Sequence, residues 1–324
     1  MEKKIDVYEA CKNADKIIVS GHINPDGDCI GSTLAMTLYL KKRLPGCDIR
    51  LLLEDYADCF KCVRNIDLIR TDFQANDPDV FIVIDTENNR LGNAEKFFKS
   101  AGYTINIDHH ISNEGGCADL NYVDAKASSA SELVRRLIPD EYMDEEIAEA
   151  IYLGIVHDTG VFKYSCTSPE TLRIAAELIG YGFDFPTLID KTFYEKSYKQ
   201  NLAMAKILLE SSLYLDGRLI VGVIDLKQMN SLGITSKDFD GVINQLRITE
   251  GVECAAFLHQ MNQSTYKVSL RSKKIIDCSK IAVSFGGGGH VRASGFFTNA
   301  EAKEIIDKIT AQVAEQFETV PGGK

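Results

Sequence analysis

Short apolar runs alternate with segments of helical periodicity through the first half of the chain, and this alternation limits the fold more than any other feature. Four runs have the length and apolar character of buried strands, namely residues 16–20, 49–53, 80–84 and 104–107. Between the first two, residues 29–44 carry Ile30, Leu34 and Leu38 at helical spacing. Strands that alternate with helices form a parallel sheet covered on both faces. The pattern therefore predicts an α/β fold with a doubly wound parallel sheet.

The later part of the chain indicates a second structural region. Helical patterns follow at residues 129–137, 144–155 and 169–179, and residues 184–210 resemble a helical connector. From residue 212 the pattern changes to strands at 213–225, 254–260 and 266–271, with helices at 241–248, 278–285 and 301–317. A chain of 324 residues is long enough for two domains, at roughly 100–200 residues each. We expect a first domain over residues 1–185, a helical linker over 186–211 and a smaller α+β domain over 212–324.

Charge and hydropathy exclude some classes of function. The formal net charge is −11, whereas proteins that bind long duplex DNA usually carry a basic surplus, because phosphate neutralisation dominates such binding. Small anionic substrates stay open. No apolar run approaches the ~20 residues of a membrane span, and the N-terminal segment lacks the apolar core of a signal peptide. We expect a cytoplasmic protein that does not contact membranes.

The nine cysteines form no repeating framework. Cys59 and Cys62 have C-x-x-C spacing, but no second cysteine or histidine pair completes a zinc site. A redox or zinc role for this pair stays open, although the sequence favours two ordinary reduced thiols.

Acidic and imidazole side chains gather where the predicted strands end. Three strands run into such residues, which are His22, Asp26 and Asp28 after the first, Asp85 after the third, and Asp108, His109 and His110 after the fourth. In an open parallel sheet, ligands bind outside the carboxyl ends of the strands. Three separate segments are therefore expected to deliver carboxylates and imidazoles to one edge of the sheet.

A fourth segment adds Asp158, which falls on the apolar face of a helix one turn after Ile155. A buried carboxylate is costly unless it is paired or bound to metal, and neighbouring carboxylates repel unless a cation bridges them. Oxygen ligands with few imidazoles suit Mn²⁺ or Mg²⁺ better than zinc. The simpler alternatives are that Asp28 caps the helix at 29–44 and that His109 is a core histidine. Four converging segments favour a site for two metal ions.

These residues lie in segments that resemble the motifs of the DHH phosphoesterase family. The segments are HINPDGDCIGS (22–32), VIDTEN (83–88), NIDHH (106–110), DAKASSASE (124–132) and GIVHDTGVFKYS (154–165). The resemblance spans most of residues 15–185. Two positions depart from the family pattern: His157 stands where threonine is more usual, and Val161 where a basic residue is common.

The resemblance implies a role for each of these residues. One divalent ion would be held by His22, Asp26 and Asp85, and the other by Asp28, Asp85, His109 and Asp158. Asp85 would bridge the two ions. Asp108 would orient the site from behind the ligands, and His110 would contact the substrate phosphate.

A glycine run marks the second region. Residues 286–289 are four glycines, followed by His290, Arg292 and Ser294, and Arg271 ends a predicted strand. Glycines let backbone N–H groups approach an anion closely. In this context the segment resembles the DHH-associated domain, which implies a group of residues that bind a nucleotide: Arg271 and His290 foremost, then Arg292, Ser294, Gly288 and Gly289.

The two regions together resemble the nanoRNase/pAp phosphatase group of the family. The resemblance implies a hydrolase in which two metal ions, Mn²⁺ foremost, activate a water, and either His110 or solvent protonates the leaving group. Expected substrates are single-stranded oligoribonucleotides of two to five nucleotides and 3′-phosphoadenosine 5′-phosphate (pAp). A phosphodiesterase for cyclic di-AMP or linear pApA would use the same residues and stays open. A nucleotide-binding regulator without catalysis would lack a ligand, and none is missing. Relatives are often dimers, so a homodimer is compatible with the resemblance.

Overall fold

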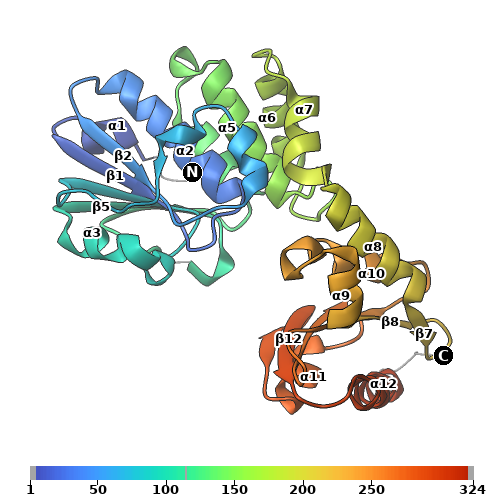
Figure 1. Cartoon of the computed structure of the whole chain (residues 1–324). Helices are drawn as coiled ribbons and strands as arrows, with labels where there is room; N and C mark the ends of the chain where they lie inside the picture. The colour runs from blue at the N-terminus through green and yellow to red at the C-terminus, as the bar shows by residue number, and fades with distance from the viewer. Residues whose placement is uncertain (1–4, 114, 320–324) are drawn as a thin grey trace. The chain divides into compact units, whose positions relative to one another are not determined.

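The chain folds into two compact units, divided between Glu195 and Lys196 (Figure 1). The computed structural model describes residues 5–113 and 115–319. Each unit contains its own sheet and its own hydrophobic core. Among the described residues, none of the helices combines the length and the apolar character that a membrane crossing requires.

The first unit is built on a six-stranded parallel sheet with the order β3-β2-β1-β4-β5-β6. Its strands are β1 (Lys16–Ser20), β2 (Asp48–Leu52), β3 (Ile69–Arg70), β4 (Val80–Ile84), β5 (Tyr103–Asp108) and β6 (Leu120–Val123). The strand order reverses direction between β1 and β4, and a ligand crevice forms at such a switch point. The doubly wound sheet predicted from the sequence is confirmed.

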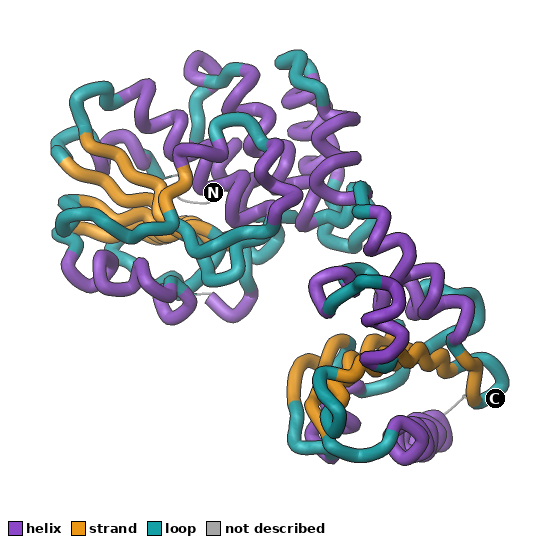
Figure 2. The backbone as a smooth tube through the Cα atoms, in the orientation of Figure 1, coloured by secondary structure: helices purple, strands orange, loops and turns teal. Residues whose placement is uncertain are grey.

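Helices cover both faces of this sheet (Figures 1 and 2). Helices α1 (Val7–Cys11), α2 (Gly27–Arg43) and α4 (Ala130–Leu137) contribute to the core on one face, and α3 (Glu95–Ser100) covers the other. Helix α5 (Glu145–Asp158) packs on α2 and α4, and helices α6 (Pro169–Ile179) and α7 (Phe185–Ile189) pack on α5. Successive residues of β1 enter different cores, because side chains of a strand alternate between its faces. Ile17 and Val19 pack with α2 and α5, whereas Ile18 packs with Phe97 of α3 on the opposite face.

The second unit has a six-stranded mixed sheet with the order β11-β12-β10-β9-β8-β7, in which only the β8–β9 pair is parallel. Its strands are β7 (Ser212–Tyr214), β8 (Leu219–Ile224), β9 (Cys254–Gln260), β10 (Tyr266–Ser272), β11 (Gly288–His290) and β12 (Ala293–Thr298). Helices α8 (Tyr198–Glu210), α9 (Leu226–Leu232) and α10 (Val242–Arg247) pack on one face, and α11 (Cys278–Ser284) and α12 (Ala302–Thr319) on the other.

The structure corrects one predicted element and adds others. The single strand expected at 213–225 is wrong, because Leu215, Asp216 and Gly217 all have positive φ and turn the chain between β7 and β8. The glycine run continues into the hairpin of β11 and β12, which the sequence did not predict. Ala203 and Ile207 of α8 lie in the core of the second unit, so this part of the expected connector belongs to that unit.

Candidate metal and catalytic site

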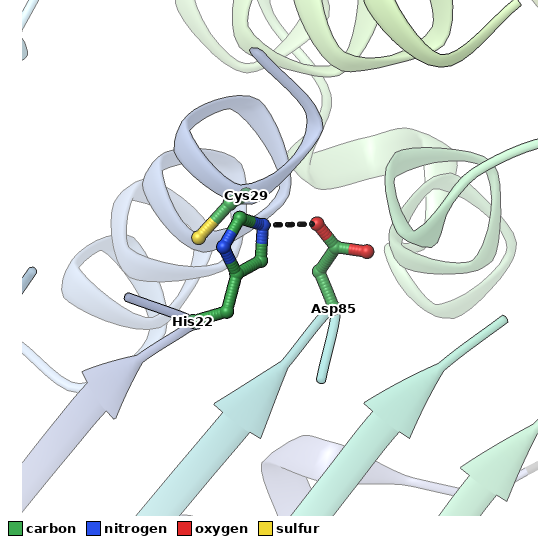
Figure 3. A group of neighbouring side chains, drawn as sticks. All are labelled: His22, Cys29 and Asp85. Atoms are coloured by element: carbon green, nitrogen blue, oxygen red, sulfur yellow. Dashed lines mark ion pairs between the residues drawn. The ribbon is translucent and has the colours of Figure 1, made fainter. Parts of the chain in front are cut away.

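The switch point of the first sheet places His22 and Asp85 face to face. His22 follows β1 and Asp85 follows β4, and Figure 3 shows the two side chains pointing toward each other from neighbouring strand ends. His22 Nε2 lies 3.4 Å from Asp85 Oδ2. Asp85 has only 2% of its surface exposed, and its backbone takes a φ of +65°. Positive φ is uncommon for a residue other than glycine and occurs where surrounding structure enforces it.

The segment after β1 supplies two carboxylates with different neighbours. Asp26 is the N-cap of α2, and its Oδ1 accepts hydrogen bonds from the amides of Asp28 and Cys29 at 3.0 and 3.1 Å. Asp28 lies in the first turn of α2 and is fully buried. Its carboxylate accepts from the amides of Ala130 and Ser131 at 2.6 and 2.9 Å, at the N-terminus of α4. The cap of α2 is therefore Asp26, whereas Asp28 binds the first two amides of α4, whose own N-cap is Ser129.

His109 gathers the remaining carboxylates on the other side of Asp85. Its Nε2 lies 3.1 Å from Asp158 Oδ2, 3.4 Å from Asp85 Oδ1 and 3.9 Å from Asp28 Oδ2. Asp158 is the last residue of α5, where the apolar helix face meets the sheet edge. Five of the six predicted ligands, with Asp85 at their centre, thus gather from four segments, whereas the more exposed Asp26 approaches only His22 among them, at 3.7 Å.

Asp108 holds the backbone and imidazole of its neighbours. Its Oδ1 accepts from the amides of His109 and His110 at 2.8 and 3.2 Å and interacts with His110 Nδ1 at 2.7 Å. Its Oδ2 accepts from Asn113 Nδ2 at 2.7 Å. Both oxygens of this fully buried carboxylate are therefore occupied. Asp108 positions the two histidines, whereas the His110 side chain remains 38% exposed at the edge of the site.

The crowded carboxylates make this edge strongly attractive to cations. Burial opposes protonation of His22 and His109, but the neighbouring aspartates outweigh it and raise the pKa of each imidazole to about 10. Burial, with Asp85 and Asp158 nearby, raises the pKa of Asp28 well above its usual range. Burial also raises the pKa of Asp158 to about 6. In the metal-free protein, protons therefore neutralise charge that a bound cation would otherwise balance.

The donor atoms fall into groups that could each hold a cation. His22, Cys29 and Asp85 form one group, and ligand atoms of Asp85, His109 and His110 form a second. Asp28, His109 and Asp158 form a third. Asp85 belongs to two groups, and its buried Oδ1 has no hydrogen-bond partner among the described residues. A buried acceptor without a hydrogen-bond partner is costly. This oxygen is therefore suited to bind a cation, which the polypeptide does not supply.

Several residues near these donors escaped the sequence analysis. Cys29 of α2 reaches the side of His22 that faces away from Asp85 (Figure 3). Asn113 connects Asp108 to Asn106, and Ser131 belongs to the helix start that holds Asp28. Cys29 and Asn106 lie inside the quoted segments 22–32 and 106–110, but nothing there gave them a role, and Asn113 lies outside every quoted segment. The segment 124–132, which contains the start of α4, was the only indication for Ser131.

The residues predicted to bind nucleotide lie in the second unit, on three neighbouring strands and, for Arg292, in the turn between two of them. Gly289 of β11 pairs with Ser294 of β12, which in turn pairs with Leu270, next to Arg271 of β10. Ser294 is buried, and its hydroxyl donates to the carbonyl of Cys278 at 2.6 Å, whereas Arg292 donates to the carbonyl of Ile276 at 2.7 Å. His290 and Gly288 are exposed.

Gly289 also has a structural reason to be glycine. Its φ is +136°, and a Cβ atom there would lie 2.6 Å from the Cα of Ser294. The close approach to β12 therefore excludes a side chain at this position.

Comparisons with known proteins match both units. The family described as "DHH family, N-terminal domain" matches residues 16–155, and the "DHHA1 domain" matches residues 216–318. The chain is 32% identical over 332 residues to the bifunctional oligoribonuclease and PAP phosphatase NrnA of Thermus thermophilus, with 98% of this chain and 95% of the relative covered. It is 28% identical over 306 residues to the probable bifunctional oligoribonuclease and PAP phosphatase NrnA of Streptococcus mutans, with 92% of this chain and 95% of the relative covered.

A solved structure shares the whole fold. The exopolyphosphatase-related protein from Bacteroides fragilis superimposes with a TM-score of 0.82 at 26% identity, covering 94% of this chain and 93% of that one. The similarity extends through both units and is not limited to the donor residues. The chain belongs to the DHH family of phosphoesterases, in the NrnA-like group that joins a DHH domain to a DHHA1 domain.

Proposed function

We propose that this protein hydrolyses phosphate ester bonds in short oligoribonucleotides and in pAp. The observation that carries the proposal is the position of Asp85, which lies buried between His22 and His109 with one oxygen lacking a hydrogen-bond partner. The names of the relatives from Thermus thermophilus and Streptococcus mutans agree with this substrate class. Very short oligonucleotides also agree with the acidic net charge, because long duplexes favour a basic surface.

The donor set suits two divalent ions, with Mn²⁺ preferred and Mg²⁺ as the alternative. His22, Asp26 and Asp85 would hold one ion, and Asp28, Asp85, His109 and Asp158 would hold the other. Carboxylate oxygens with a minority of imidazoles favour these ions over softer metals. When bound, such ions supply Lewis-acid chemistry that activates water and stabilises negative charge on the phosphoryl oxygens.

The protein's own residues position the reacting groups. Asp108 fixes the Nδ1 side of His110, which leaves Nε2 of this half-exposed imidazole to contact the substrate phosphate or to protonate the leaving oxygen. The amides at the start of α4 fix the orientation of the Asp28 side chain at the site. These contacts keep the donors in place before substrate arrives, so less reorganisation is needed during the reaction.

The second unit would supply the nucleotide contacts. Arg271 and His290 are the foremost candidates, because both residues pair with Ala293 of β12 from opposite sides and so lie in the same region of the sheet. Arg292, Gly288 and Gly289 are further candidates. Ser294 contributes through the fold, since its hydroxyl is already donated to a backbone carbonyl.

A substrate panel tests the proposal. Purified protein would be supplied with Mn²⁺ and incubated separately with pApA, pAp, a long RNA and cyclic di-AMP, with a chelator-treated sample as the control. We expect rapid, chelator-sensitive turnover of pApA and pAp and little attack on the other two. A preference for the cyclic dinucleotide would replace the proposal with a signalling phosphodiesterase. Binding of nucleotides without turnover of any substrate would favour a regulator.

A further inference from the structure

The Cys59-Phe60-Lys61-Cys62 segment has no part in the proposed catalysis, although it lies close to the site. It forms a 3₁₀ turn, Asp58–Cys62, in the first unit. Both cysteines are exposed, whereas Phe60 between them is only 5% exposed. The spacing alone favoured two ordinary thiols. The turn adds that both cysteine side chains lie on the same face.

The turn places the two sulfur-bearing side chains on one face. Residues i and i+3 eclipse in a 3₁₀ helix, and one turn advances the chain by about 6 Å. This separation lies inside the range of roughly 4.4–6.8 Å between Cα atoms that a disulfide spans. Cys62 Sγ also lies 3.1 Å from the carbonyl oxygen of Cys59, so this sulfur already folds back over the turn. A bridge between the two residues therefore needs a rotation of both side chains and a small tightening of the turn.

Phe60 links the turn to the donor residues. Its ring contacts the ring of His157, with 5.1 Å between centroids, and Phe193 contacts His157 at 5.4 Å. His157 directly precedes Asp158, and its ring lies so close to Gly27 that a Cβ there would be 2.1 Å from Cγ of the imidazole. Gly27 lies between Asp26 and Asp28. A displacement of Phe60 would therefore reach two of the segments that deliver carboxylates.

Cys62 can meet a small reagent from solvent. It lines a pocket of about 220 Å³ together with Arg64, Glu149, Asp184, Thr187, Leu188 and Lys191. Burial raises the pKa of Cys62, while the nearby Lys191 ammonium acts in the opposite direction. Only a small fraction of Cys62 is thiolate at neutral pH, so exchange is slow. Because Cys62 is accessible but exchanges slowly, we expect a disulfide to form only under sustained oxidation and to be absent under reducing conditions.

We propose that Cys59 and Cys62 form a reversible disulfide that weakens cation binding at the catalytic site. The Cys62 thiolate attacks a small disulfide, such as oxidised glutathione, and expels one thiol. Cys59 then attacks the sulfur of Cys62 and expels the second thiol. Two protein thiols are oxidised while one small disulfide is reduced to two thiols, and the two protons end on the leaving thiols. Closing the bridge draws the turn together and shifts Phe60 away from His157.

Mass spectrometry tests the chemistry without reference to the proposed function. Full-length protein is equilibrated in mixtures of reduced and oxidised glutathione, and its cysteine peptides are mapped. We expect a peptide bridged between residues 59 and 62 in the wild type, and a glutathione adduct on Cys62 in Cys59→Ser. Cys166, the other exposed cysteine of the described residues, is the internal control. Absence of the bridged peptide when Cys166 carries glutathione would overturn the proposal.

A second measurement tests the link to the site and rests on the proposed metal binding. Mn²⁺ affinity is measured by calorimetry for oxidised and reduced wild type and for Cys59→Ser treated in the same way. We expect a severalfold loss of affinity on oxidation of the wild type, no change in Cys59→Ser, and a loss without oxidant in Phe60→Ala. Equal affinities of the bridged and reduced wild type would overturn the link. Absence of Mn²⁺ binding in the reduced protein would instead count against the proposed function.

Discussion

Asp85 carries more of the proposed chemistry than any other residue. It is buried, takes a positive φ at the end of β4, and faces a histidine on each side. A backbone strain of this kind is retained where surrounding structure enforces it, and such positions cluster at functional sites. The amide of Asp85 also donates to the carbonyl of Ile107 at 2.9 Å, so the strand β5 holds it in place.

The substitution Asp85→Asn removes a charge that two ions would share. We expect turnover of pApA to fall to the metal-free background and Mn²⁺ binding in calorimetry to lose at least one site, with an unchanged circular dichroism spectrum. Asp216→Asn is a matched control, because the Asp216 side chain is 96% exposed in a turn of the second unit. Near-normal turnover of Asp85→Asn would exclude a bridging role.

His290 permits a test of the second unit at the same scale. It is exposed on β11, so its substitution leaves both cores intact. If it contacts the nucleotide, His290→Ala should raise KM for pApA about tenfold or more, the loss expected from one charged hydrogen bond. Turnover of bis(p-nitrophenyl) phosphate should change little. Equal losses on both substrates would show that His290 does not contact the nucleotide.

At the scale of elements, the crossing of α2 and α5 positions two donor segments. Asp28 lies at the start of α2 and Asp158 at the end of α5, so the spacing between these helices sets the spacing between their carboxylates. The helices approach closely at Gly31, where a Cβ atom would lie 2.3 Å from the carbonyl oxygen of Ala150. Backbone contacts of this kind cannot yield by a change of rotamer.

Gly31→Ala should therefore push the two helices apart. We expect the free energy of unfolding to fall by about 1–3 kcal/mol, as for overpacked cores, and Mn²⁺ affinity to fall with it. Gly46→Ala is the matched control, since nothing lies within 4 Å of a Cβ atom at that position. Urea denaturation and calorimetry give the two values. A Gly31→Ala protein as stable as the Gly46→Ala protein would contradict the close crossing.

At the scale of the whole molecule, each unit carries a separate core and can respond separately to its surroundings. In the second unit, burial lowers the pKa of His259 to about 4, with Lys267 adding to the effect. His259 packs against Phe239 and Phe257. The neutral imidazole is thus favoured in the folded unit, whereas the unfolded chain takes up a proton near pH 6.5.

The stability of the second unit should therefore depend on pH. Between pH 6.5 and 4 the unfolded state binds more protons, so the free energy of unfolding falls as the pH decreases, by about 3 kcal/mol at pH 4. Because His157 has the same lowered pKa in the first unit, the readout must be local, such as hydrogen exchange of β9. His259→Phe should flatten the dependence in β9, and an unchanged slope in that variant would contradict the assignment.

Periodicity and strand-end residues determined much of this protein. The strands β1 and β4 begin and end where the apolar runs do, and α6 has its predicted bounds, because burial and local hydrogen bonding act over a few residues. The carboxyl ends of parallel strands meet at one edge, which placed His22, Asp85 and His109 there. Helical periodicity placed Asp158 on the apolar face of α5. The turn at residues 215–217 was missed, because a run of apolar residues on both sides concealed it.

Only the tertiary structure decided which partners these residues find. Asp28 accepts hydrogen bonds from the first amides of α4, more than a hundred positions along the chain, and Cys29 joins His22 and Asp85 through the packing of α2 on the sheet. Both oxygens of Asp108 accept hydrogen bonds from the protein, from a backbone amide and from Asn113, which makes Asp108 a positioning residue and not a metal ligand in the proposed site. Periodicity reports the face on which a side chain lies, whereas the identity of its partner depends on how distant elements pack.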